Sequence, residues 1–201
     1  MKSKYFQLIA IIGAIVISGI FIRNKSNKLE KLSILQTFSD PANWDTLQLR
    51  FNFDQAHEAI KFAEIRSKVG KSETNCAQIP IGVEFGPTLQ LAAGTFNQKI
   101  VLVKIDFDLK MIEGPCSDLM VVYSLGKDGE FFAYNNPTLS LPTPEKINEW
   151  NHYHFEFSKT PEEVIELDPQ ELIVFLQSPS KANHVLIDNL QLTLTQLPLN
   201  L

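Results

Sequence analysis

The sequence predicts an all-β protein, an antiparallel β-sandwich, preceded by one N-terminal transmembrane helix. Three observations lead to this prediction. The first is an uncharged apolar run near the start of the 201-residue chain, the second is a period of two in several later segments, and the third is turn-forming residues between those segments. The predicted units are an anchor over residues 1–23, a linker over residues 24–45 and a β-sandwich domain over residues 46–197.

The apolar run Phe6–Ile22 contains only Gln7 and Ser18 as polar residues. At about 1.5 Å per residue, a helix of this length nearly crosses the ~30 Å hydrocarbon core of a bilayer. A soluble helix would carry a polar face, and this run has none. A cleaved signal peptide is the alternative, with Ser18 and Gly19 as small residues at the cleavage site. An uncleaved anchor is favoured because the apolar residues continue beyond them.

The basic residues on either side of this run support opposite orientations. Lys2 and Lys4 precede it, as is typical of exported proteins, whereas a larger group of basic residues follows it. By the positive-inside rule, the larger group would place the domain in the cytosol. The prediction is a single-pass membrane protein with its domain on the exported side, periplasmic or extracellular, and the opposite orientation stays open.

Charge and cysteine content limit the partners. The formal net charge is -5, and the basic residues cluster only around the N-terminal run, so a nucleic-acid-binding face is not expected. Cys76 and Cys116 allow one intramolecular disulfide. They would form it in an oxidising compartment and stay free thiols in the cytosol, and the sequence leaves both states open.

Strands account for most of the remaining chain. Lys99–Lys110 is the clearest, because its apolar and charged residues alternate as in a half-buried antiparallel strand. The other predicted strands are Leu47–Phe53, Ile79–Leu91 with a break at Gly86-Pro87, Leu119–Leu125, Glu130–Tyr134, Trp150–Phe157, Leu172–Leu176 and His184–Leu194.

The connections between these strands also favour a sandwich. The sequence GKDG, between Leu119–Leu125 and Glu130–Tyr134, is suited to a tight hairpin turn. Short helices are expected only at Ala56–Ile65 and Pro161–Ile165. Several strands with regularly spaced turns and few helices are typical of a sandwich.

The last predicted strand contains an acidic residue in an apolar position. The spacing of Leu190, Leu192 and Leu194 extends backwards to Leu186 and Asp188, which places Asp188 on the apolar side. A buried carboxylate needs hydrogen-bond donors or a cation as a partner.

This ending resembles the last strand of jelly-roll domains of the galactose-binding-like class, which includes many carbohydrate-binding modules. Phe51–Asp54 resembles their acidic first strand, Ser67–Ser72 their glycine-containing segment, and Trp150 the start of a core strand. The resemblance extends from about Leu47 to Thr195. The domain is also similar to small envelope-associated β-sandwich proteins of Bacteroidetes-type bacteria.

The resemblance implies a structural calcium ion between the acids of the first and last strands, here Asp54 and Asp188. Calcium takes six to eight oxygen ligands, so backbone carbonyls would have to complete the site. The alternative is that Asp188 accepts backbone N–H bonds at an irregularity of its strand.

Sugar binding calls for aromatic rings beside amides and acids. Tyr134, Asn135 and Asn136 form such a cluster, and Tyr153 is a fourth candidate. The alternative is that these aromatic side chains are structural.

No catalytic signature is present in the sequence. His152 and His154 share one face of a strand and could ligate zinc, but a third ligand is not evident. A glycosidase needs a pair of carboxyl groups, although charges on an outward strand face are ordinary. The candidate carboxylates are Asp106, Asp108, Glu156, Glu162 and Glu163. No nucleophile elbow, phosphate-binding loop or zinc-protease motif occurs.

The sequence therefore predicts a membrane-anchored, non-catalytic module that binds carbohydrate or another cell-envelope component. The alternative is a structural or protein-interaction domain of an envelope complex, with no small-molecule ligand.

Overall fold

The structure of the chain is a computed structural model. It describes residues 28–55, 57–61, 63–92, 94–96, 99–115, 118–127, 130–135, 147–166 and 171–198, with the backbone alone for residue 127 and residues 130–135. The predicted anchor Phe6–Ile22 lies outside these residues. Within them, no helix is long and apolar enough to cross a membrane.

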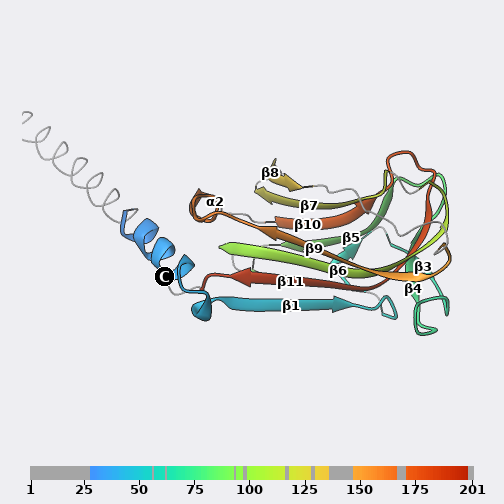
Figure 1. Cartoon of the computed structure of the whole chain (residues 1–201), viewed down its shortest axis with the longest axis horizontal. Helices are drawn as coiled ribbons and strands as arrows, with labels where there is room; N and C mark the ends of the chain where they lie inside the picture. Colours follow the sequence, from blue (N-terminus) through green and yellow to red (C-terminus); the bar gives the residue numbers. More distant parts are fainter. Residues whose placement is uncertain are drawn as a thin grey trace, which may run out of the picture.

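Two antiparallel sheets lie one above the other (Figure 1). The six-stranded sheet has the order β3-β4-β11-β6-β9, and β1 pairs with β11 beside this path. The five-stranded sheet has the order β2-β5-β10-β7-β8. The strands are β1 (Asp45–Phe51), β2 (Ile60–Lys61), β3 (Glu64–Arg66), β4 (Cys76–Ile79), β5 (Phe85–Ala92), β6 (Ile100–Glu113), β7 (Met120–Lys127), β8 (Glu130–Asn135), β9 (Trp150–Ser158), β10 (Glu171–Gln177) and β11 (His184–Gln196). The predicted β-sandwich is confirmed.

Alternate residues of the long strands fill the space between the sheets. In β6, Ile105 and Phe107 are fully buried, and the Phe107 ring stacks on Tyr153 of β9 at 5.6 Å. From the other sheet, Tyr123 of β7 stacks on Phe157 of β9 at 5.1 Å. Such aromatic pairs add to the apolar burial that holds the layers together.

Strand β11 changes its alternation part-way along. Its pairing with β6 shifts register between Asp188 and Gln191, and Asn189 has a φ of 51°. Asparagine tolerates this left-handed conformation better than most residues. The residues of β11 that belong to the core are Val185 and Ile187 before the shift, and Leu190, Leu192 and Leu194 after it.

The shift reverses the predicted direction of Asp188. Asp188 pairs with Asp108, whose neighbours Phe107 and Leu109 belong to the core. Because successive residues of a strand alternate, Asp188 lies on the outer face of the six-stranded sheet. The prediction that it faces the apolar side was wrong, because the bulge changes the phase of the strand.

The predicted helix at Ala56–Ile65 was also wrong, since the described part of this segment contains β2 and the start of β3. Ile60 pairs with Leu89 of β5, and the Gln90 amide donates to the Ala59 carbonyl at 2.8 Å. These pairings with neighbouring strands override the weak local helical pattern.

The predicted strand Ile79–Leu91 is not continuous, because β4 ends at Ile79 and β5 begins at Phe85. The predicted break at Gly86 is misplaced, since Gly86 lies inside β5. The actual turn follows β4, where the Val83 amide donates to the Pro80 carbonyl at 3.1 Å and Gly82 has a φ of 90°. Glycine is the residue that adopts such a φ without steric cost.

The predicted helix near residue 161 is present as α2 (Pro161–Glu166). The Glu163 amide donates to Thr160 Oγ1 at 3.3 Å, and the Thr160 amide donates to Glu163 Oε2 at 2.7 Å. This reciprocal pair is a capping box, which explains where the helix begins.

The predicted linker is partly folded. Residues 28–38 are helical, and a short 3-10 helix, η1 (Pro41–Asn43), follows them. Ile34 is 2% exposed, and Phe38 and Trp44 pack beside it. Ile34 and Phe38 lie on one face because they are four residues apart. The small core that they join contains Val101, Val164 and Leu197.

We expect Ile34→Ala to lower the free energy of unfolding by about 2–4 kcal/mol, because it leaves a cavity in this small core. The matched control is Leu32→Ala in the same helix, since Leu32 is exposed. Its effect should stay within about 0.5 kcal/mol. Urea unfolding of the detergent-solubilised full chain measures both values. Equal small effects would mean that the helix does not pack on the sandwich.

Candidate functional site

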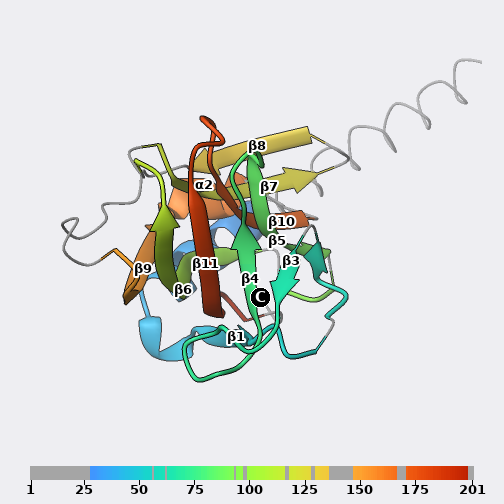
Figure 2. The same cartoon turned by 90° about the vertical axis from the view of Figure 1, so that its right-hand side faces the viewer.

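An open pocket of about 550 Å³ lies where β1 ends. Its wall contains both apolar side chains and side chains that can form hydrogen bonds. The polar lining residues are Arg50, Asn52, Asp54, Gln55, His57 and Asn75, and the apolar ones are Phe51, Phe53, Ile60, Ala63 and Ile65. We call this site the β1-end pocket. Figure 2 views the molecule from the side on which β3 and β4 lie.

Two buried aromatic side chains hold the turn after β1 from the side of the core. Phe51 and Phe53 are buried in the core, and His57 lies edge-on to the Phe51 ring at 4.9 Å. Phe53 has a φ of 59°, an uncommon conformation for a bulky residue, which the burial of its ring stabilises. The polar groups between the two rings therefore point away from the core, towards the pocket.

Hydrogen bonds connect this turn to the loop that precedes β4. The Asp54 amide donates to Asn52 Oδ1 at 3.3 Å, and the Asn75 amide donates to Asp54 Oδ1 at 2.8 Å. Asn75 is itself a lining residue. The shape of the β1-end pocket therefore depends on the position of the loop over residues 67–75.

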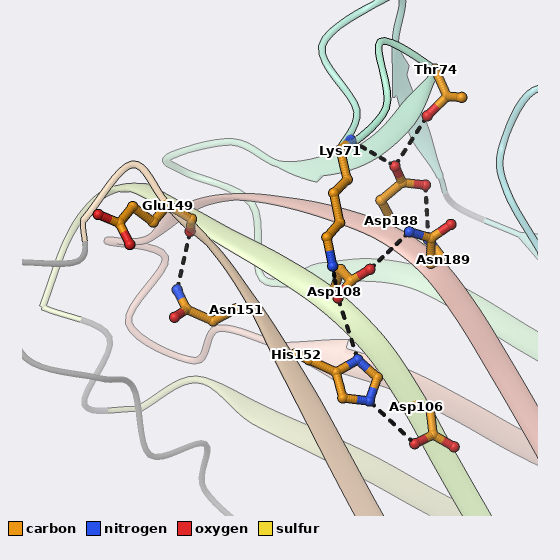
Figure 3. A network of polar contacts seen from close by, with 9 residues as sticks. All are labelled: Lys71, Thr74, Asp106, Asp108, Glu149, Asn151, His152, Asp188 and Asn189. Carbon is orange, nitrogen blue, oxygen red and sulfur yellow. Dashed lines mark hydrogen bonds and ion pairs between the residues drawn. The ribbon is translucent and has the colours of Figure 1, made fainter.

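Asp188 holds that loop from underneath (Figure 3). Its Oδ2 accepts hydrogen bonds from the Lys71 amide at 2.9 Å and from Thr74 Oγ1 at 3.1 Å, and its Oδ1 accepts one from the Asn189 amide at 2.8 Å. The residue is 1% exposed. A Cβ on Gly70 would lie 2.7 Å from Asp188 Oδ2, so a glycine is needed for this close approach.

Asp108 holds the same loop through the Lys71 side chain. In Figure 3 this side chain extends from the loop to Asp108, and the distance from its Nζ to Asp108 Oδ1 is 2.9 Å. Asn189 Nδ2 donates to Asp108 Oδ2 at 2.8 Å, and His152 Nδ1 lies 3.3 Å from Oδ1. Burial acts to raise the pKa of Asp108, but the hydrogen bonds from Asn189 and Lys71 outweigh it and lower the pKa.

The same outer face continues as a ladder of charged pairs between β6 and β9. His154 Nδ1 lies 2.6 Å from Asp106 Oδ1, and His154 Nε2 lies 3.2 Å from Glu156 Oε1. Lys104 pairs with Glu156 at 2.5 Å. The hydrogen bond with Asp106 is the main cause that raises the pKa of His154.

The histidines and acids on the outer face of the six-stranded sheet do not form a metal site among the described residues. No group of three His, Cys, Asp or Glu side chains could hold an ion there. His152 and His154 bind the carboxylates opposite them instead.

The calcium site implied by the resemblance does not fit either. The Asp188 oxygens are surrounded by N–H and O–H donors, whereas calcium needs a shell of oxygen ligands. Asp54 binds the Asn75 amide at the end of the same loop. The two acids therefore hold one loop by hydrogen bonds, which agrees with the alternative role expected for Asp188.

Of the four predicted sugar-binding residues, the structure describes the side chain of Tyr153 and the backbone of Tyr134 and Asn135. Tyr153 is buried in the core against Phe107, which corrects the expectation that it faces a ligand. Tyr134 and Asn135 lie in β8, where they pair with Ser124 and Tyr123 of β7. Asn136 lies outside the described residues.

The predicted disulfide stays a prediction, because Cys116 lies outside the described residues. The Cys76 thiol is buried in β4. Burial, and then the nearby charge of Asp188, raise the pKa of this thiol to about 11. A thiol of this kind is unreactive near neutral pH.

An apolar groove of about 560 Å³ lies on the outer face of the five-stranded sheet. Phe85, which is 48% exposed, and Phe175 meet there at 5.8 Å. The other lining residues are Val83, Glu84, Thr88 and Ile173. We call it the β5–β10 groove.

Comparison with known proteins gives likenesses of fold. No family model matches the chain, and no curated protein matches it. A CBM22 xylan-binding domain of Paenibacillus barcinonensis Xyn10C superimposes with a TM-score of 0.48 and 17% identity, covering 76% of this chain and 96% of that one. The chain resembles this module in fold.

Two further structures are similar. A carbohydrate-binding module of Cellvibrio mixtus lichenase 5A, in complex with cellotriose, has a TM-score of 0.41 and 7% identity, and covers 72% of this chain and 95% of that one. A cleaved adhesin domain of the Porphyromonas gingivalis Lys-gingipain has a TM-score of 0.43 and 12% identity, and covers 73% and 97%.

Most of the β1-end pocket was not predicted from the sequence. Asp54 was a candidate ligand, but Arg50 and Asn75 were not, and the contact of Lys71 with Asp108 was not expected. The run of polar residues after β1 was the available signal. Its link to residue 75 depends on contacts between distant segments, which periodicity does not show.

We expect Asp188→Asn to lower the free energy of unfolding by about 2 kcal/mol or more, because the new amide cannot replace a buried, charged acceptor of three hydrogen bonds. Urea unfolding of the full chain measures this. Trypsin should also cleave faster after Lys68 or Lys71, since the loop loses its support. The matched control, Asp54→Asn, removes one exposed acceptor and should cost less than about 1 kcal/mol.

A chelator separates this role from metal binding. Addition of EDTA should leave the melting temperature of the wild-type chain unchanged. A fall in melting temperature that Asp188→Asn abolishes would contradict the proposed loop support and would indicate a bound ion.

We expect His154 to stabilise the fold more in acid than in base. Its pKa is raised in the folded state, chiefly by the hydrogen bond with Asp106, so its contribution is present below the ordinary histidine pKa and is lost as the pH rises through the raised pKa. Because the side chain is 45% exposed, the difference should be a few tenths of a kcal/mol.

The measurement compares wild type and His154→Gln by urea unfolding at about pH 5 and about pH 8.5. The stability difference should be larger at the lower pH, and it should shrink in an Asp106→Asn background. A difference that does not depend on pH would refute the coupling.

Proposed function

We propose that this chain is a membrane-anchored, non-catalytic module that binds carbohydrate in the β1-end pocket. The observation that carries the proposal is the composition of that pocket, in which a guanidinium, amides, an acid and an imidazole surround an apolar floor. Such a combination suits a ligand that has many hydroxyl groups and also apolar C–H faces.

The polar and apolar groups would have separate tasks. Arg50, Asn52 and Gln55 are exposed side chains that can donate hydrogen bonds, and Asn52 and Gln55 can also accept them. Each sugar hydroxyl both donates and accepts, so amides are well suited to it. Ile60 and Ile65 supply apolar surface for the C–H face of a sugar ring. The site would thus bind a glycan without chemical change.

The absence of a second acid in the pocket supports binding and not hydrolysis. Among the described residues that line it, Asp54 is the one carboxylate. Glycoside hydrolysis needs a pair of carboxyl groups, one on each side of the bond.

The position of the pocket also suits a tethered receptor. Strand β1 begins next to Trp44, which packs beside Ile34 of the helical residues 28–38, and it ends at the pocket. Seven residues of strand span about 23 Å. With Phe6–Ile22 as the proposed anchor, the pocket lies at the far end of the sandwich from the membrane. We further propose that the domain is on the exported side.

A second candidate function is protein interaction within an envelope complex. The β5–β10 groove favours it, because Phe85 and Val83 are exposed there beside Phe175. Exposed apolar surface of this kind is common at protein contacts. A partner that binds there would not occupy the β1-end pocket.

A glycan array probed with the detergent-solubilised full chain tests the first proposal. We expect binding to at least one class of glycan, with Asn52→Ala lowering the affinity about tenfold through the loss of one or two hydrogen bonds. Thr46→Ala is the matched control, since it is an exposed position of the same strand outside the pocket. Its affinity should equal that of wild type.

The array would count against the proposal if nothing bound, or if both variants bound like wild type. Loss of binding in Phe85→Ser, with full binding in Asn52→Ala, would move the site to the β5–β10 groove.

A further inference from the structure

The helical residues 28–38 have two apolar faces, of which the sandwich covers one. Ile34 and Phe38 pack against the small core at the end of the sandwich. Leu29, Leu32 and Leu35 are 58%, 54% and 41% exposed. Exposed leucines grouped on one short helix are unusual in a soluble protein and indicate a contact surface.

Helical geometry separates the two faces, and Leu35, at about 100° from Ile34, lies at the border between them. Each residue turns the helix by about 100°, so Leu32 lies about 200° from Ile34. Leu29 and Leu35 are each three residues from Leu32, which makes them its neighbours on adjacent turns. The leucine face therefore points away from the sandwich and is available to a partner.

The short length of chain between the apolar run and this helix limits which partner the leucines can reach. The apolar run ends at Ile22, and residues 23–28 span at most about 20 Å even when fully extended. The headgroup layer is about 5–8 Å thick on each side of the hydrocarbon core. If Phe6–Ile22 spans a membrane, Leu29 and Leu32 are held at or near the surface of that membrane.

The charges beside the leucines are complementary to an anionic surface. Between the apolar run and Ser33 there is one acidic residue, Glu30. The basic residues of the same stretch are Arg23, Lys25, Lys28 and Lys31. Lys28 lies four residues before Leu32, and Lys31 lies four residues before Leu35, so each lysine is one turn from a leucine. A helix with leucines on one side and lysines beside them is typical of segments that lie in the headgroup region of anionic bilayers.

We propose that Leu29, Leu32 and Leu35 insert into the surface of an anionic bilayer, with Lys28 and Lys31 contacting lipid phosphates. This inference rests on the proposed anchor and goes beyond it. An anchor alone would leave the tilt of the domain unspecified. A helix embedded by its leucines and bound to the sandwich through Ile34 fixes how the domain stands, with the β1-end pocket directed away from the lipid.

Tryptophan quenching by brominated lipid tests the insertion in the full chain. Leu32→Trp is reconstituted into vesicles of phosphatidylcholine and phosphatidylglycerol, in which the phosphatidylcholine is brominated near its headgroup. The emission of the parent chain, from Trp44 and Trp150, is subtracted. We expect the added emission to fall at least about twofold relative to unbrominated vesicles.

Ile65→Trp is the matched control, because Ile65 is a comparably exposed apolar residue in β3, beside the β1-end pocket. Its emission should not change with bromination. Lys28→Glu combined with Lys31→Glu should remove most of the quenching of Leu32→Trp, since the acidic side chains repel the anionic surface.

Ile11→Trp distinguishes failure of this inference from failure of the anchor. Quenching of Ile11→Trp by lipid brominated deep in the acyl chain, without quenching of Leu32→Trp, would overturn the inference and leave the anchor intact. No quenching of Ile11→Trp would refute the anchor and, with it, this inference. A Leu32→Trp emission that is blue-shifted but not quenched would show that a second copy covers the leucine face, which also overturns it.

Discussion

The register shift in β11 is the constraint on which the rest of the structure depends. One strand must contribute Ile187 and Leu190 to the core, although they are three residues apart, and the bulge at Asn189 makes this possible. Asp188 is thereby directed to the outer face, opposite Asp108. Two carboxylates then face the loop over residues 67–75 from the sheet, and that loop forms part of the pocket wall.

The energetic role of these carboxylates is to specify the loop more than to stabilise the fold. Burying Asp108 and Asp188 costs desolvation energy, and the hydrogen bonds and the Lys71 ammonium offset much of it. The loop also contains Lys68 and Glu73 in left-handed conformations, which are uncommon outside glycine and asparagine. Such a backbone persists only where its surroundings hold it, and here the two buried acids do so.

Periodicity predicted the strands well where a single face is buried along the whole strand. From Val103 to Met111 in β6, and from Tyr153 to Phe157 in β9, every second residue belongs to the core or packs against it, so the core face could be read from the sequence. It failed for Asp188, because one extra residue reverses the phase and no property of the local sequence marks the reversal. It also missed the pocket, since Asn52 and Asn75 meet through a hydrogen bond of Asp54 across distant segments.

A rigid pocket matters most for a ligand whose individual contacts are weak. Each sugar hydroxyl gives up hydrogen bonds to water on binding, so the net gain per contact is small. Ordering a mobile loop at the same time would consume much of that gain. Here Asp188 and Lys71 order the loop before any ligand arrives, and Phe51 and Phe53 order the facing turn. For the glycan ligand that we propose, the buried charges on the sheet would therefore contribute to affinity, because they order the loop in advance.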